Sequence, residues 1–479
     1  MRRQWVVSTD TERACPPGWT RENIGPPAIL DFHPDLLVHR FANEHWRAWL
    51  VGHGLLEPES RLPTDDDLPI DSSEPTIVRF ANRLAGVYAL VISHRSGVDV
   101  YTDPAGLMTT YFSDRSAASS PSLLLTGDED AGRLQMIDPV AGWIPGDRTP
   151  FPGVRYLQGN HRLRLGGNPV RVWPAPDGAP LACRNHDEID ALVREAGEQI
   201  ASQASAVLAR SDRVRVSLSG GYDSRVVAGA FGAALGRAPD ADIECFTIAT
   251  SASNPDLQIA QRVASACGLA HKHMLTPSAD ADNPYSDEYG RITGDLVFRN
   301  RSSVLPALAE YAAGSTTHAN GNLGAIGKRF YTWPATTTHA VHRAIQSGFS
   351  RRISRETRDA LSRWTHGLPM SLPELHQVLL YAEHRGGRWM GPGDQGTALL
   401  MHAWTPFCSR RLILDAVTFR LSTDAEHRDF LEELAVTIQP SLAGVPYYSG
   451  RKSVLSMWTP WYLKSIPRKI KGMMHNLRS

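Results

Sequence analysis

The chain has 479 residues, 42% of them hydrophobic and 21% charged, a composition typical of a globular protein with two or three domains. Fifty basic and fifty acidic residues cancel, and without a basic excess we expect no nucleic-acid partner. The five cysteines are dispersed and form no CxxC pair, so we expect neither a zinc site nor a disulfide framework. We find no signal peptide and no apolar run long enough to span a bilayer, and we therefore expect a cytoplasmic chain without a membrane span.

The first part of the chain is expected to be rich in β-strands. RLAGVYALVIS (83–93) and VDVYTD (98–103) carry β-branched and aromatic residues around a Ser-Gly turn, which predicts a hairpin. YLQGNHRLRL and NPVRVW, separated by Gly166-Gly167, predict a second hairpin. Residues 57–75 are acidic and proline-rich, which indicates a surface loop, and PAPDGAPLACRN (174–185) predicts a domain boundary.

After this boundary the hydrophobic period becomes helical from Asp187 onward. A strand is predicted over 213–218, a helix through Leu235, a strand over 243–249 and a helix over 255–268. Strands alternating with helices indicate a parallel sheet with helices on its faces. Beyond about residue 330 the pattern is mainly helical.

The stretch VSLSGGYDSRVVAGAF (216–231) joins the first of these strands to its helix. Glycines at such a joint expose the main-chain N–H groups of the helix start, which bind anions. Asp223 would repel a phosphate unless a cation lay between them, which indicates Mg²⁺. By these features alone, the loop is either an anion site or a plain structural turn.

The string SGGYDS resembles the SGGxDS pyrophosphate loop of ATP-pyrophosphatases, and its context resembles the asparagine synthetase family, which includes β-lactam synthetases and lasso-peptide cyclases. FTIATSASNPDLQIAQRVASACGLAH (246–271), PFCSRRLILDA (406–416) and HRDFLEELAVTIQPSL (427–442) are similar to further segments of that family. GVYALVIS, YTDPAGLMTTYF and LLLTGDEDA are similar, in order and spacing, to its glutaminase domain.

The resemblance implies an α/β chain with a degenerate glutaminase-like α+β sandwich over 1–183 and a parallel-sheet ATP-pyrophosphatase domain over 187–479, with a helical C-terminal part. It implies binding of ATP and Mg²⁺, with Asp223 as the metal ligand and Lys452 as the catalytic lysine. The residues expected to contact the nucleotide are Leu218, Ser219, Gly220, Gly221, Asp223, Ser224, Ile248 and Gly321. Lys328 is a second cation near Gly321, and a surface role is the alternative for both lysines.

The sequence departs from the family pattern at two positions. Arg2 stands where the glutaminase has its nucleophilic cysteine, and a guanidinium cannot replace a thiolate. In HANGNLGAIGKRFY (318–331), Ala325 stands where an acid is expected to help hold Mg²⁺. Another acid such as Asp295 could substitute in space. The same gap is what an inactive family member would leave.

The resemblance therefore implies an AMP-forming amide ligase that activates a small-molecule or peptide carboxylate and joins it to an amine other than ammonia released from glutamine, in bacterial natural-product or envelope biosynthesis. The first alternative is an inactive scaffold that binds nucleotide or a partner. A second is another ATP-pyrophosphatase, such as an RNA-thiolating enzyme, against which the neutral charge and the glutaminase-like half argue. A homodimer is left open.

Overall fold

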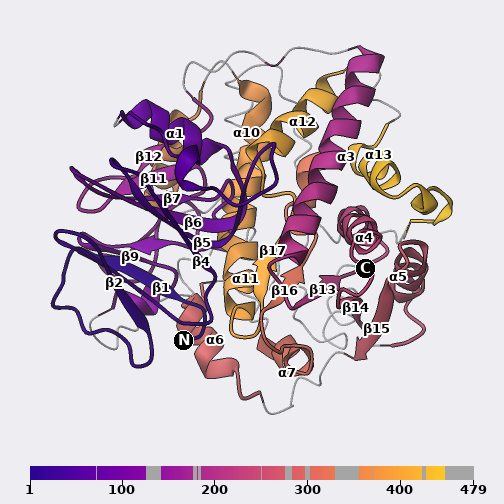
Figure 1. Cartoon of the computed structure of the whole chain (residues 1–479), viewed down its shortest axis with the longest axis horizontal. Helices are drawn as coiled ribbons and strands as arrows, with labels where there is room; N and C mark the ends of the chain where they lie inside the picture. Colours follow the sequence, from indigo (N-terminus) through magenta and orange to yellow (C-terminus); the bar gives the residue numbers. More distant parts are fainter. Residues whose placement is uncertain are drawn as a thin grey trace, which may run out of the picture.

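The computed structural model describes residues 1–71, 73–125, 142–175, 181, 185–249, 251–275, 283–296, 302–328, 355–369, 372–422 and 428–447. Its N-terminal β-rich part lies on one side and its parallel sheet with the helices α3, α4, α5 and α13 lies on the other (Figure 1). The helices α10, α11 and α12 lie between the two parts in this view.

In the described residues, the N-terminal part contains two six-stranded antiparallel sheets. The first has the strand order β10-β8-β9-β1-β3-β2 and the second the order β12-β11-β7-β6-β5-β4. The strands of the first sheet are β1 (Trp5–Ser8), β2 (Thr20–Gly25), β3 (Ala28–Phe32), β8 (Tyr111–Phe112), β9 (Ser116–Ala118) and β10 (Arg155–Tyr156). Those of the second are β4 (Val38–Ala42), β5 (Arg47–Leu56), β6 (Leu84–His94), β7 (Gly97–Thr102), β11 (His161–Arg164) and β12 (Val170–Arg171).

Strand β6 is buried on both faces of the second sheet. Val87, Ala89 and Val91 belong to the main core, which also includes residues of the first sheet. Leu90 and Ile92 point the other way, into a smaller core with the helix α1 (Glu74–Asn82). Because successive side chains of a strand point to opposite faces, one continuous apolar run fills two cores. Both predicted hairpins are confirmed, as β6–β7 and β11–β12.

The third sheet is parallel, with the order β15-β14-β13-β16-β17. Its strands are β13 (Arg213–Ser217), β14 (Ile243–Ala249), β15 (Ala270–Leu275), β16 (Thr316–Ala319) and β17 (His402–Trp404). The predicted strands and helices between 187 and 268 are confirmed, with ends that differ by up to two residues. Strand β17 departs from the helical pattern expected after residue 330.

The remaining helices surround this sheet and join it to the N-terminal part. They are α3 (His186–Leu208), α4 (Tyr222–Leu235), α5 (Pro255–Ala266), α6 (Ser286–Thr293), α7 (Leu305–Ala309), α9 (Arg355–His366), α10 (Pro373–Leu379), a π-helix (Leu380–Met390), α11 (Gly391–Thr397), α12 (Arg410–Leu421) and α13 (Phe430–Ile438). Short 3-10 helices span Asp65–Asp67, Pro121–Leu123, Ser302–Val304, Gly324–Gly327 and Pro440–Gly444. None of the helices in the described ranges is both long and apolar enough to cross a membrane.

The segment 406–416 ties the two parts together. The N–H of Gly86 donates to the Cys408 carbonyl at 2.7 Å, and the buried Arg410 guanidinium donates to Asn160 Oδ1 at 2.9 Å and to the Tyr88 hydroxyl at 3.1 Å. One hydrophobic cluster runs from Trp5 of β1 to helices of the second part. The change of architecture falls between β12 and α3, near the predicted boundary, and the domain limits stay a prediction.

Candidate functional site

A cavity of about 410 Å³ opens where β13 and β16 end. These neighbouring strands have Val216 opposite Ala319, so their carboxyl ends meet at one edge of the sheet. The strand order reverses here, because β14 and β15 extend to one side of β13 while β16 and β17 extend to the other. Open parallel sheets bind ligands at such a switch point. The lining residues are Ser217, Leu218, Ser219, Asp223, Ser224, Phe246, Thr247, Ile248, Asp256, Val304, Leu308, His318, Asn320, Gly321, Asn322, Asp394 and Thr397.

The glycine loop closes on itself through its two serines. Ser219 N–H donates to Ser224 Oγ at 3.0 Å, and the two hydroxyl oxygens lie 2.9 Å apart. Gly221 is the N-cap of α4, and no side-chain hydrogen bond caps the helix there. An N-terminus of this kind leaves main-chain N–H groups for an anion. Gly220 N–H donates to a carboxylate oxygen of Asp256 at 2.9 Å, so one loop amide already binds an oxyanion.

Asp223 lies in the first turn of α4 and forms an ion pair with Lys328. Lys328 Nζ donates to Asp223 Oδ1 at 2.6 Å, and each side chain is 33% exposed. Partial burial raises the pKa of Asp223 above its ordinary value, and the Lys328 ammonium opposes that rise. The expected metal ligand therefore has a protein cation as its partner.

Two glycines allow the loop after β16 to approach α4 closely. A Cβ on Gly321 would lie 2.9 Å from Ser224 N, and one on Gly324 would lie 2.5 Å from Asp223 Cβ and Cγ. Leu323 between them adopts a φ of +68°, a left-handed conformation that β-carbons disfavour. Gly321 lines the cavity, and its contact with a nucleotide stays a prediction.

Asp295 does not replace the acid missing at position 325, because it is not among the residues that line the cavity. Asp394 of α11 lines it instead, with 5% of its side chain exposed. It accepts hydrogen bonds from Asn322 Nδ2 at 2.8 and 3.0 Å and from Asn320 Nδ2 at 3.3 Å. Sequence reasoning missed this acid, which ends the sequence GPGD (391–394) shortly after Trp389 and belongs to no recognised motif.

The three lining carboxylates do not converge on a metal. The Asp223 carboxylate is paired with Lys328, that of Asp256 with a loop amide and that of Asp394 with amides of two asparagines. Among the described residues, no group of three or more His, Cys, Asp or Glu could hold a metal ion. A metal held mainly by protein ligands therefore does not fit this arrangement.

Leu218 and Ile248, two of the expected nucleotide contacts, line the cavity together with the apolar residues Phe246, Val304 and Leu308. Thr247 Oγ1 donates to the Leu218 carbonyl at 2.7 Å, which fixes the end of β13. The remaining expected contacts, Ser219, Gly220, Gly221 and Ser224, form the loop described above. Six of the eight expected nucleotide residues line the cavity, and the N–H groups of the other two, Gly220 and Gly221, donate to lining residues.

Lys452, the expected catalytic lysine, lies outside the described residues. Tyr447 is the last described residue before it, and its ring stacks on Tyr222 with centroids 4.1 Å apart. Arg225 fixes this segment by donating to the carbonyls of Val445 and Pro446, both at 2.7 Å. The chain therefore leaves the described structure next to the glycine loop.

Two other charged features of the sequence have structural roles in the fold. Arg2 forms an ion pair with Asp35 at 2.6 Å. Glu383, which is fully buried, accepts two hydrogen bonds from Arg171 at 2.7 and 2.8 Å and one from Trp364 Nε1 at 2.6 Å. The Glu383 carboxylate is thus satisfied by an internal ion pair between the two parts of the chain.

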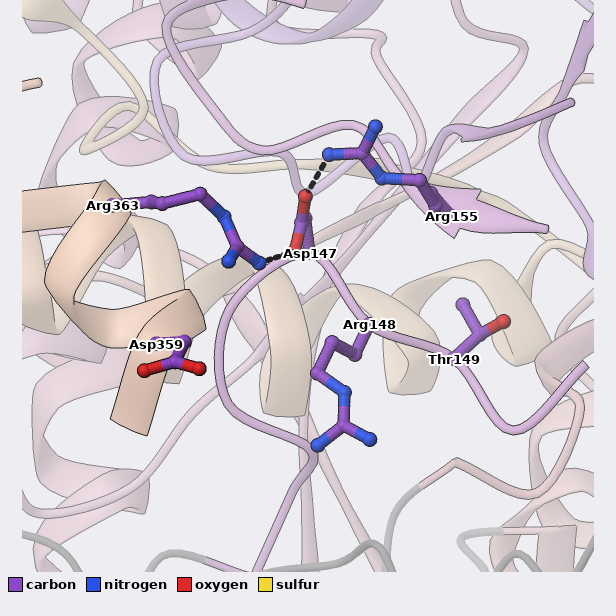
Figure 2. Close-up of a pocket in the computed structure, with 6 residues that line it drawn as sticks. All are labelled: Asp147, Arg148, Thr149, Arg155, Asp359 and Arg363. Carbon is purple, nitrogen blue, oxygen red and sulfur yellow. Dashed lines mark hydrogen bonds and ion pairs between the residues drawn. The ribbon is translucent and has the colours of Figure 1, made fainter. Parts of the chain in front are cut away.

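A second cavity, of about 560 Å³, lies beside α9 and is rich in arginine (Figure 2). Asp147 pairs there with Arg155 and with Arg363, the latter at 3.7 Å. Burial alone would raise the pKa of Asp147, but the Arg155 hydrogen bond lowers it below its ordinary value. Because Arg155 and Arg363 are directed at the Asp147 carboxylate, this cavity is a weaker candidate for an anion-binding site than the glycine loop.

Residues 198–320 match the family model Asparagine synthase, which covers β13, the glycine loop and the end of β16. No curated protein matches the chain. The chain is similar to the U34-tRNA thiolase NcsA from Methanococcus maripaludis at 11% identity, covering 58% of this chain and 94% of that one, with a TM-score of 0.25.

It is similar to NAD+ synthetase from Burkholderia pseudomallei at 15% identity, covering 37% and 89%, with a TM-score of 0.19. It is also similar to glutamine phosphoribosylpyrophosphate amidotransferase from B. subtilis at 13% identity, covering 68% and 71%, with a TM-score of 0.20. TM-scores this low establish nothing by themselves, so the assignment rests on the family model. The match shows that residues 198–320 are similar to the Asparagine synthase family, and this range contains the glycine loop and the two strands whose ends border the cavity.

Proposed function

We propose that the chain is an ATP-dependent, AMP-forming amide ligase, or carbon–nitrogen ligase, that acts on a carboxylate and an amine. The observation that carries this proposal is the uncapped N-terminus of α4 behind the SGGYDS loop, at the switch point of a parallel sheet in an asparagine synthase domain. The match of residues 198–320 to the Asparagine synthase family supports ATP use and ligation. The substrate class and the residue roles below are proposals.

In the first step, a substrate carboxylate attacks the α-phosphate of ATP, giving an acyl-adenylate and releasing pyrophosphate. Leu218 and Ile248 offer an apolar slot for adenine, and Gly321 borders the ribose and α-phosphate. The N–H groups in the uncapped first turn of α4 bind the β- and γ-phosphates, where negative charge accumulates as the bond breaks. Magnesium, when it accompanies the nucleotide, supplies further charge neutralisation, with Asp223 as its one expected protein ligand.

In the second step, the amine attacks the activated carbonyl, AMP leaves and the amine loses a proton. A cation near the carbonyl would stabilise the developing oxyanion. We assign this role to Lys452. It follows Tyr447 by five residues, which extend to at most about 17 Å, and Tyr447 stacks on a residue of the glycine loop.

We further propose that the N-terminal part has no glutaminase activity, so the amine comes from the substrate. The guanidinium at position 2 pairs with Asp35 and has no nucleophilic atom to form a thioester. A route through ammonia from glutamine would show as glutamate release. A small-molecule or peptide substrate, a cytoplasmic site of action, a homodimer and a role in bacterial natural-product or envelope biosynthesis remain parts of the proposal.

Two observations favour the alternative of an inactive, nucleotide-binding scaffold. Ala325 offers no carboxylate, and Asp223 is neutralised by Lys328. A scaffold of this kind would bind ATP at the loop and release neither AMP nor pyrophosphate.

The two functions differ in the exchange of labelled pyrophosphate into ATP, which requires a reversible first step. We expect exchange that depends on an added carboxylate, with a panel of amino acids, peptides and sugar acids as probes, and no glutamate release from glutamine. ATP binding measured by calorimetry without exchange for any carboxylate would support the scaffold and contradict the ligase.

A further inference from the structure

Lys328 lies next to Asp223, a residue that lines the cavity, and hydrogen bonds hold its backbone in place. It follows the 3-10 helix Gly324–Gly327, and its N–H donates to the Ala325 carbonyl at 3.1 Å. Its carbonyl accepts a hydrogen bond from Arg420 Nη1 at 3.1 Å. Because both backbone groups are bonded, the side chain starts from a fixed point.

The Lys328 ammonium has two described contacts, and both belong to the glycine loop's helix. Nζ donates to Asp223 Oδ1 at 2.6 Å and lies 4.8 Å from the centroid of the Tyr222 ring. Tyr222 is itself held by its stack on Tyr447. One third of the Lys328 side chain remains exposed, and its ammonium lies 2.6 Å from a carboxylate oxygen of Asp223, which lines the cavity.

The cavity needs a cation to bind a polyphosphate. Its lining includes the three carboxylates of Asp223, Asp256 and Asp394, and no lysine or arginine among the described lining residues. Three carboxylates facing an anion of several charges would be strongly repulsive at these short distances. Positive charge must therefore come from a metal or from a side chain at the rim.

Two small residues in the loop after β16, Gly324 and Ala325, leave room for Lys328 beside Asp223. Position 325 is alanine, so no second carboxylate lies there to complete a metal site with Asp223. A Cβ at position 324 would lie only 2.5 Å from Asp223, so glycine is needed there for the loop to pass this close to α4. This close approach brings Lys328, four residues later, to the Asp223 carboxylate.

We propose that Lys328 is a phosphate-contacting residue that supplies at this loop the positive charge a protein-held metal would otherwise supply. Asp223 is then a positioning residue: it orients the ammonium in the free protein, and the phosphates share that ammonium when nucleotide binds. This inference rests on the proposed function, because it takes the ligand to be ATP.

The test is the affinity for α,β-methylene-ATP, which cannot be cleaved at the bond in question, measured by calorimetry in excess Mg²⁺ and in EDTA. The wild-type chain is expected to bind in both. Lys328→Met keeps the apolar stem and should weaken binding in EDTA by about tenfold to a hundredfold, the worth of a charged hydrogen bond. Lys328→Arg should restore most of the affinity. Lys272→Met is the matched control, because Lys272 also lies over a tyrosine ring, whereas only Lys328 of the two is paired with Asp223, a residue that lines the cavity.

Asp223→Asn separates the two roles of the carboxylate. If it positions Lys328, binding in EDTA persists in this variant and the gain from Mg²⁺ matches the wild type. Binding that requires Mg²⁺ in the wild type and disappears in Asp223→Asn would overturn the inference, as would equal affinities of Lys328→Met and Lys272→Met. A wild-type chain that binds under neither condition would overturn the proposed function as well. Circular dichroism melts show that each variant is folded.

Discussion

At the scale of single residues, the glycines of the site are as important as its polar side chains. Gly221 has a φ of −80° and a ψ of −179°, a conformation open to any residue, so its lack of a side chain is not required by the backbone. A Cβ there would meet only Ser219 Oγ, at 3.3 Å. We therefore expect that the space left by the missing side chain serves a ligand at the start of α4.

Gly221→Ala should therefore fold normally and bind ATP at least about tenfold more weakly, because the methyl group occupies the approach of a phosphate to the helix N–H groups. Gly236→Ala is the matched control at the opposite end of the same helix. A Cβ on Gly236 makes only an ordinary contact, 3.5 Å from the Ala233 carbonyl. Calorimetry with ATP measures both. Equal affinity of the two variants would mean that the loop binds no phosphate.

The individual residues also show what sequence can and cannot give. The glycines, serines and Asp223 of the loop are adjacent in sequence, so their joint role follows from a local pattern. The contact between Lys328 and Asp223 joins residues 105 apart, and Asp394 meets Asn322 across 72 residues. Such pairs depend on the order of strands in the sheet, which a single sequence does not specify.

At the scale of elements, apolar runs and turn signals predicted the hairpins and the alternating strands and helices after residue 187. Strand β17 was missed because three residues carry no period and its pairing with β16 comes entirely from tertiary structure. Helix α1 lies at the edge of the acidic segment expected to be a loop. Its Ile77 and Phe80 are buried against the second sheet, a contact that local propensity does not reveal.

Helix α4 also anchors the C-terminal segment, through Arg225. This guanidinium is fully buried, donates to two carbonyls at 2.7 Å and lies 3.7 Å from the Tyr447 ring centroid. Arg225→Met would leave both carbonyls without these donors and should lower the free energy of unfolding by about 2 to 4 kcal/mol. Urea denaturation measures this loss. Arg237→Met, an exposed arginine after the same helix, is the control, and an equal loss in both variants would show that the segment is not anchored in this way.

At the scale of the whole molecule, the N-terminal sheets and the parallel sheet share one hydrophobic core and a set of buried polar contacts. Glu57 follows β5 and contacts both α3 and α12. Its carboxylate accepts hydrogen bonds from Ser409 Oγ at 2.7 and 3.0 Å and from Gln203 Nε2 at 3.0 Å. Ser409 Oγ in turn accepts from Leu412 N at 3.0 Å and caps α12.

Burial raises the pKa of Glu57 to about 7, and the hydrogen bonds from Ser409 and Gln203 oppose that rise only in part. Between the ordinary value for glutamate and about 7, the folded chain therefore holds a proton at Glu57 that the unfolded chain has released. The contribution of this residue to stability is complete at acid pH and is lost as the pH rises toward 7.

Glu57→Gln keeps the hydrogen-bond acceptor and removes the titration. From about pH 4.5 to pH 8, we expect the wild type to lose about 3 kcal/mol of unfolding free energy relative to this variant. Urea denaturation across that range gives the difference directly, and all other titrating groups are common to both chains. Glu59→Gln, at an exposed glutamate that pairs with Arg83, should follow the wild-type curve. Parallel pH profiles for wild type and Glu57→Gln would mean that Glu57 is ionised in the folded chain and that the junction between the two parts tolerates a buried negative charge.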